Sequence, residues 1–134
     1  MKKPCCFIIA VLSMFALNIS STLFAAALSS DAKQFLAGYE AVRSALANDD
    51  LAAALKAAAP LGESGAAIAK SGTLAEARSA FDKLSADAIK LASGHEGYYV
   101  AHCDMVNKDW LQTSRQISNP YVGKEMAGCG EIKK

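Results

Sequence analysis

The segment from Leu28 to about Gly94 is rich in alanine and almost free of β-branched residues. Alanine has the highest helix propensity and branching at Cβ lowers it, so this composition favours helix. Apolar residues in the segment also recur at intervals of three and four, the period of an amphipathic helix. The sequence therefore predicts a mostly α fold: a small bundle of three to four helices, followed by an irregular C-terminal loop segment.

Three helices are expected in the alanine-rich segment. The first begins near residue 30 or 31 and ends at 48–50, and the second runs from about 49 or 50 to 59. The third begins after Thr73, where Thr73 and Glu76 have the spacing of a capping box, and ends at residue 94. The expected buried residues are Phe35, Tyr39, Val42 and Leu46 in the first helix, Leu51, Ala54, Leu55 and Ala58 in the second, and Leu74, Ala77, Phe81, Leu84, Ala88 and Leu91 in the third.

Aromatic and turn-forming residues replace alanine after residue 97. We expect this segment to be mostly irregular, with a short strand or an extended stretch at 98–100. A fourth helix is predicted over Asp109–Ile117, and Asn119-Pro120 ends it because the residue before proline avoids helical backbone angles. The glycines over 123–130 permit a tight loop.

The N-terminal residues have the pattern of an export signal. Lys2 and Lys3 precede an apolar stretch over 7–17, and Ala25-Ala26-Ala27 supplies the small residues that a signal peptidase requires. A membrane anchor needs about 20 apolar residues in succession, and polar residues interrupt this stretch before it reaches that length. We expect residues 1–27 to be a cleaved signal and residues 28–134 to be one periplasmic or secreted domain with no membrane span.

Charge and motifs exclude several classes of function. The formal net charge is +1 for the whole chain and about −1 without Lys2 and Lys3, with acids and bases interspersed, so nucleic acid is not an expected partner. The sequence has no Ser-His-Asp order, zinc-protease motif, paired carboxylates or phosphate loop, and its distal cysteines do not form a Cys-x-x-Cys motif. We expect a protein that is not an enzyme.

The candidate chemistry lies in two short clusters, His102 to Met105 and Met126 to Cys129. Imidazole, thiolate and thioether groups together suit soft metals such as Cu(I). Adjacent side chains in an extended segment point to opposite faces, so His102 is expected to be an auxiliary ligand only. The predicted copper site consists of Cys103, Met105, Met126 and Cys129, with His102 in reserve.

Each of these groups also has a structural interpretation. Cys103 and Cys129 are about 26 residues apart, and in an oxidising compartment a disulfide between them would stabilise the fold by about 3 kcal/mol. A reducible disulfide that opens to receive metal is a third interpretation. The two methionines are alternatively core residues that fill irregular gaps. Trp110 and Tyr121 are expected in the core, in preference to covering a metal pocket.

The residues from Tyr99 to Gly130 resemble the pattern of the DUF3347 domain family, which runs approximately as tyrosine, Cys-Pro-Met, a Trp-Leu pair and Asn-Pro-Tyr-x-Gly-x-x-Met-x-x-Cys-Gly. The matching positions are Tyr99, Cys103, Met105, Trp110, Leu111, Asn119, Pro120, Tyr121, Gly123, Met126, Cys129 and Gly130. The resemblance implies a small helical periplasmic domain, found alone or appended to periplasmic adaptor subunits of copper and silver efflux pumps. Asp104 departs from the pattern, because the family usually has proline there; the change frees the loop and places a hard carboxylate beside soft ligands.

Two functions from different classes follow from these observations. The first is a periplasmic protein that binds or buffers a soft metal, Cu(I), in heavy-metal homeostasis. The second is a disulfide-stapled, non-catalytic interaction module that docks onto an efflux adaptor or another envelope protein. Its docking surface would consist of Tyr98, Tyr99, Trp110 and Tyr121.

Overall fold

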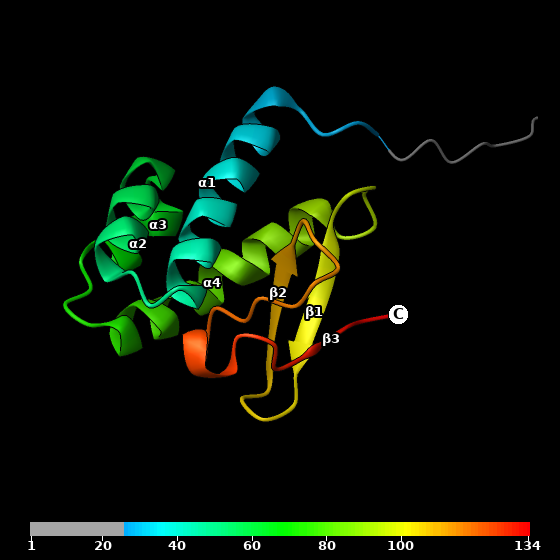
Figure 1. Cartoon of the computed structure of the whole chain (residues 1–134). Coiled ribbons are helices and arrows are strands. Elements are labelled where there is room, and N and C mark those ends of the chain that lie inside the picture. The colour runs from blue at the N-terminus through cyan, green and yellow to red at the C-terminus, as the bar shows by residue number, and fades with distance from the viewer. Residues whose placement is uncertain (1–25) are drawn as a thin grey trace, which may run out of the picture.

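The structure is a computed structural model that describes residues 26–134, so the predicted signal over 1–27 lies outside the described residues except for its last two alanines. Four α-helices come first, and a small sheet follows them (Figure 1). The helices are α1 (Ser30–Ala47), α2 (Leu51–Ala58), α3 (Glu63–Ala69) and α4 (Leu74–Ala92), with a 3-10 turn η1 (Ala59–Leu61) between α2 and α3. No helix in this part of the chain is long and apolar enough to cross a membrane.

The three predicted helices correspond to α1, α2 and α4, with similar starts and ends, whereas α3 was not predicted as a separate helix. The Thr73 hydroxyl accepts a hydrogen bond from the Glu76 N–H, which fixes the first turn of α4. The Glu76 carboxylate reaches back one residue further than a capping box requires and accepts from the Gly72 N–H at 2.7 Å. The predicted second helix ends at Ala58, and the residues after it form η1 and the separate helix α3.

The core lies where α1 and α4 meet each other and the sheet. Tyr39 of α1 stacks on Phe81 of α4, with 5.4 Å between the ring centroids. Most of the predicted apolar positions are buried or half-buried, as expected from their helical spacing. Leu91 is the exception among them, because it lies in the last turn of α4 with 36% of its surface exposed.

The C-terminal segment corrects the sequence-based prediction. Residues 109–117 do not form a fourth helix: strand β1 (Tyr99–Cys103) pairs antiparallel with β2 (Lys108–Gln112) and with the short strand β3 (Glu131–Ile132), in the order β2-β1-β3. The extended stretch expected at 98–100 overlaps the start of β1, and most of the segment outside these strands is irregular, as predicted. A four-residue turn joins β1 to β2, and its last residue, Asn107, has φ +51°, a conformation that asparagine tolerates well. The turn closes a β-hairpin. This hairpin was missed in the sequence-based prediction because Trp110 and Leu111 were assigned to a helix.

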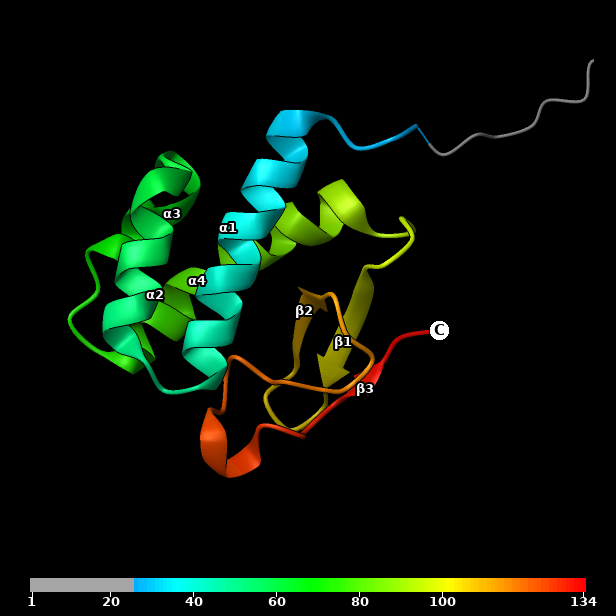
Figure 2. The same cartoon turned by 45° about the horizontal axis from the view of Figure 1, so that its top comes forward.

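The free edge of β2 is closed by side chains of the helices, which lie alongside it in both views (Figures 1 and 2). The Tyr39 hydroxyl donates to the Leu111 carbonyl and accepts from the Leu111 N–H, each at 2.9 Å. The Ser85 hydroxyl donates to the Asp109 carbonyl at 2.9 Å. Burial raises the pKa of Tyr39, so its hydroxyl keeps the proton that it donates. The helices thus supply the hydrogen bonds that a further strand would otherwise make.

Replacing Tyr39 by phenylalanine should destabilise the protein by about 1–3 kcal/mol, because it leaves the buried N–H and carbonyl of Leu111 without partners. Urea denaturation measures the loss. Tyr98→Phe, at a half-exposed tyrosine, is the matched control and should change stability by less than about 0.5 kcal/mol. Equal effects of the two substitutions would contradict the role given to the Tyr39 hydroxyl.

Candidate functional site

The pairing of β1 with β3 brings the two cysteines together. Cys103 is the last residue of β1, and Cys129 lies just before β3. The register pairs His102 with Glu131, so its continuation sets Gly130 opposite Cys103, with Cys129 next to that position. The two backbones approach so closely that a Cβ at Gly130 would lie 2.7 Å from the His102 carbonyl oxygen. Glycine is therefore required beside the pair.

Both cysteines carry free thiols, and a hydrogen-bonding interaction between them shifts the pKa of each. Burial opposes ionisation of the fully buried Cys103. Four donors outweigh burial and lower the pKa of Cys103: the Cys129 thiol, the backbone N–H groups of Val106 and Met105, and the Asn119 side chain. The same hydrogen bond, together with burial, raises the pKa of the half-buried Cys129. Of the two thiols, Cys103 is therefore the one that ionises more readily.

The two methionines of the predicted site lie at the surface. Met105 is 54% exposed in the turn after Cys103, and Met126 is 45% exposed at the end of the 3-10 turn η2 (Lys124–Met126). The alternative expectation that both fill the core is wrong. The Cys129 N–H donates to the Met126 carbonyl at 2.8 Å, so this methionine belongs to the same tight turn as the outer cysteine. Each thiol is thus accompanied in its segment by an accessible thioether.

The structure does not bring His102 to the cysteine pair. Neighbouring side chains of β1 point to opposite faces of the sheet, as they do in any regular strand. Its Nδ1 lies 2.6 Å from an Asp109 carboxylate oxygen and its Nε2 lies 3.0 Å from an Asp104 oxygen. The hydrogen bond to Asp109, and secondarily that to Asp104, raises the pKa of His102. Both ring nitrogens are engaged, and Asp104, which replaces the family proline, contacts the imidazole.

The ligand types gathered around the pair are therefore sulfur donors. Within residues 26–134, no group of three or more His, Cys, Asp or Glu side chains is arranged to hold a metal ion. Methionine is not among these four residue types, so this absence does not concern the thioethers of Met105 and Met126. The candidate site consists of the two thiols, with Met105 and Met126 on the adjoining turns.

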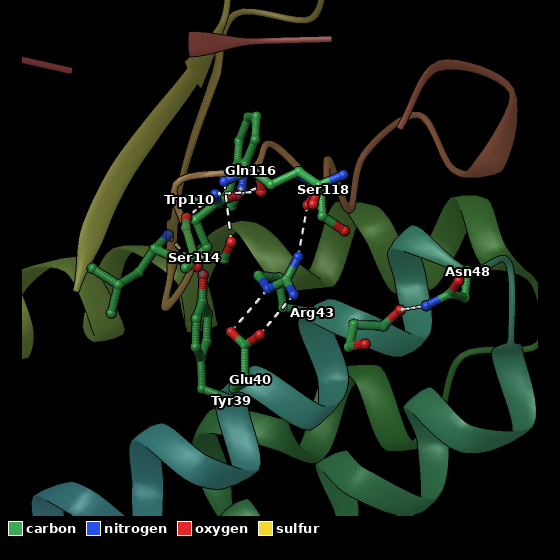
Figure 3. Close-up of polar contacts among 11 residues, drawn as sticks. Tyr39, Glu40, Arg43, Asn48, Trp110, Ser114, Gln116 and Ser118 are labelled. Carbon is green, nitrogen blue, oxygen red and sulfur yellow. Dashed lines mark hydrogen bonds and ion pairs between the residues drawn. The ribbon is translucent and has the colours of Figure 1, made fainter. Parts of the chain in front are cut away.

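Two arginines of the helices hold the segment that follows β2. Arg43 of α1 donates to the Ser118 carbonyl at 2.7 Å while Glu40 engages its guanidinium through two further hydrogen bonds (Figure 3). Arg78 of α4 donates to the Pro120 carbonyl at 2.9 Å. Both contacts are made to main-chain oxygens, so they fix the path of the chain at Ser118 and Pro120.

Asn119, between these two clamped residues, was predicted only to end a helix, and its part in the site was missed. It is fully buried, and its Nδ2 donates to the Cys129 carbonyl at 2.9 Å. Its Oδ1 accepts from the Tyr121 N–H at 2.8 Å. The Asn-Pro-Tyr motif carried the signal for this role, because asparagine side chains favour a hydrogen bond to the backbone two residues on.

The aromatic residues next to the site belong to the core. Trp110 is fully buried, as predicted, and its indole N–H donates to Gln112 at 2.9 Å. Tyr121 is half-buried and meets Phe81 and Trp110 edge-on, with ring centroids 5.6 and 6.4 Å apart. These contacts wedge the C-terminal segment between the helices and the sheet.

Gly123 lies against a latch that holds the beginning of η2. Asp49, just after α1, accepts from Arg78 at 2.5 Å and from the Lys124 N–H at 3.0 Å. The hydrogen bond from Arg78 lowers the pKa of Asp49. Gly123 has φ +71°, and a Cβ there would collide with the Asp49 carboxylate and lie 2.6 Å from the Arg78 guanidinium. Only glycine fits between them.

The comparisons with known proteins add no relative: no family model, no curated protein and no solved structure matches this chain. The resemblance to the DUF3347 domain family stays a prediction from the motif.

Gly123→Ala should destabilise the protein by about 2–3 kcal/mol, because it adds a steric collision to an unfavourable backbone conformation. Gly62→Ala is the matched control, since Gly62 has φ +60° but nothing within 4 Å of the added Cβ; it should cost about 1 kcal/mol. Urea denaturation of both variants measures the difference. A Gly123 variant no less stable than the Gly62 variant would contradict the latch.

The His102 contacts predict a pH-dependent contribution to stability. Since the folded-state pKa of His102 is raised, the contribution should be complete below the unfolded value of about 6.5 and lost as pH rises through the folded value. The stability difference between wild type and His102→Gln should therefore shrink from pH 5 to alkaline pH. Urea denaturation across this range tests it, and a constant difference would show that the imidazolium is not held by the carboxylates.

Proposed function

We propose that the protein binds one Cu(I) ion through Cys103 and Cys129 and buffers or hands on this ion in the periplasm. The observation that carries the proposal is the pair of free thiols that the β1–β3 pairing brings together. The lowered pKa of the buried member supports it. Thiolates are the protein ligands that Cu(I) prefers. Binding of Cu(I) as a dithiolate releases the thiol protons, and the lowered pKa of Cys103 favours this release.

The accessibility of the sulfur atoms supports an uptake from the outer side of the site. Cys103 is fully buried, whereas Cys129 is half-buried and both methionines are exposed. A Cu(I) ion would meet the thioethers and Cys129 first and would reach Cys103 by ligand exchange. Thioethers are neutral and soft, so they bind Cu(I) without adding charge. This arrangement suits a protein that accepts and releases the ion.

The proposal favours Cu(I) over zinc. Structural zinc sites use four ligands, usually thiolates and imidazoles. The imidazole next to the pair in sequence, His102, has both nitrogens engaged by Asp104 and Asp109. A dithiolate with thioether support is complete for Cu(I), which accepts two to four soft ligands.

The second candidate function is the disulfide-stapled interaction module. The adjacency of the two thiols favours a disulfide as much as it favours a dithiolate. The docking surface assigned to this module has less support, because Trp110 is fully buried and Tyr121 packs against Phe81. Tyr98 and Tyr99, both half-buried, are the members left to dock. We therefore propose that a disulfide between Cys103 and Cys129 is the oxidised form of the metal site.

Anaerobic titration of the reduced mature protein with Cu(I), against a chromophoric Cu(I) chelator, tests the proposal. We expect one Cu(I) per chain, and an affinity about a hundredfold lower in Cys103→Ser and in Cys129→Ser, because each loses a charged ligand. Met105→Leu and Met126→Leu should weaken binding by a smaller factor. His102→Gln is the matched control and should bind as wild type does.

The native mass of protein isolated from a copper-supplemented periplasm distinguishes the two candidates. Copper retained on unoxidised thiols supports the metal-binding function. A mass two protons below that of the reduced chain, combined with no Cu(I) binding after reduction, would reject it in favour of the stapled module.

A further inference from the structure

We propose that Asn119 is the positioning residue of the cysteine pair: it holds the turn that carries Cys129 against the strand that ends in Cys103. This role rests on the proposed function only in that the two thiols act together, on one ion or in one bond. Asn119 belongs to neither cysteine segment, and it lies between them in the folded chain.

The hydrogen bonds of Asn119 reach both sides of the site. Its Nδ2 donates to the Cys129 carbonyl at 2.9 Å. Its backbone N–H donates to the Ala127 carbonyl at 2.8 Å. One buried residue thus holds the turn that carries Cys129 at two points, and its side chain also contributes to lowering the pKa of Cys103.

The orientation of the Asn119 amide follows from its neighbours. The Oδ1 side meets the Tyr121 N–H, a donor, and the Nδ2 side meets the Cys129 carbonyl, an acceptor. The reversed amide would place donor against donor and acceptor against acceptor, leaving buried polar groups unpaired. The amide nitrogen is therefore the group directed at the cysteine pair.

Side chains from two helices hold Asn119 in position. Arg43 of α1 and Arg78 of α4 hold the carbonyl groups of the residues before and after it. A functional group fixed by helices keeps its geometry better than one on a free loop. The helices therefore help to fix the Cys129 turn beside β1 through this side chain, in addition to the β1–β3 pairing.

The dithiol–disulfide equilibrium separates positioning from general stabilisation. A residue that only stabilises the fold does so equally in the reduced and oxidised forms, and leaves the equilibrium between them unchanged. A residue that holds the two sulfurs together raises the tendency of the pair to oxidise. In glutathione buffer the two protein thiols lose two electrons and two protons to form the disulfide, and glutathione disulfide takes them up to become two thiols.

We would compare this equilibrium constant in the mature wild-type protein, Asn119→Ala and Asn48→Ala. Asn48 is a matched control, because its side chain also donates to a main-chain carbonyl, that of Ser44 at 2.8 Å, but caps α1 at the surface. The oxidation constant should fall about tenfold in Asn119→Ala, because the Cys129 turn loses the hydrogen bond that holds it in place, and stay within about twofold in Asn48→Ala. A constant unchanged or raised in Asn119→Ala would overturn the proposal.

A measurement on the wild-type protein covers the case in which Asn119→Ala does not fold. The side-chain amide resonances of Asn119 should shift in nuclear magnetic resonance spectra when the cysteine pair is oxidised by glutathione disulfide, and those of Asn48 should not. Asn119 resonances that stay in place would contradict the positioning role.

Cu(I) titration of the same proteins distinguishes this inference from the proposed function. A wild-type protein without Cu(I) affinity would reject the metal-binding function, while a tenfold fall in the oxidation constant of Asn119→Ala would still support positioning. A wild-type protein that binds Cu(I), with an oxidation constant insensitive to Asn119, would reject the positioning role alone.

Discussion

The docking of the C-terminal segment onto the helices through two arginines is the interaction on which the rest of the site depends. Arg43 and Arg78 donate to main-chain carbonyls on either side of Asn119, and the Asp49 latch holds the chain a few residues further on. Guanidinium groups that are partly buried need such partners, since an unpaired buried charge costs several kcal/mol. Among the described residues, every buried side-chain nitrogen or oxygen has a hydrogen-bond partner. The helices therefore determine where the segment lies, although they supply neither cysteine.

The sheet and the helices need each other for a related reason. A hairpin of two five-residue strands is marginal by itself in water, and a two-residue third strand adds little. Tyr39 and Ser85 supply hydrogen bonds to the outer edge of β2, and Trp110 and Leu111 bury their side chains in the shared core. The hairpin in return covers the apolar faces of α1 and α4. The cysteine pair lies at the end of β1 farthest from the connection to α4, where the strand meets the returning C-terminal segment.

The helices could be predicted from the sequence because their signals are local. Alanine content, apolar spacing and the Thr73 cap each act within one or two turns. The hairpin was missed because Trp110 and Leu111 gain their strand conformation from partners far along the chain, such as Tyr39, and the turn depends on the tolerance of Asn107 for a positive φ. The pairing of residues near Cys103 with residues near Cys129 is likewise non-local. The sequence therefore identified both cysteines as candidate site residues but could not show that they are neighbours in the fold. For His102, strand alternation made it an auxiliary ligand only, and its two carboxylate partners became visible only in the fold.

The asymmetry of the cysteine pair follows from this architecture. Cys103 is part of a strand, and the N–H groups of the turn after it converge on its sulfur, so its environment is set by the hairpin. Cys129 depends on a loop held at separate points by Asn119, Asp49 and the arginines. The two thiols therefore differ in what holds them: Cys103 is set by a strand and the turn after it, whereas Cys129 is set by side-chain hydrogen bonds from other segments of the chain.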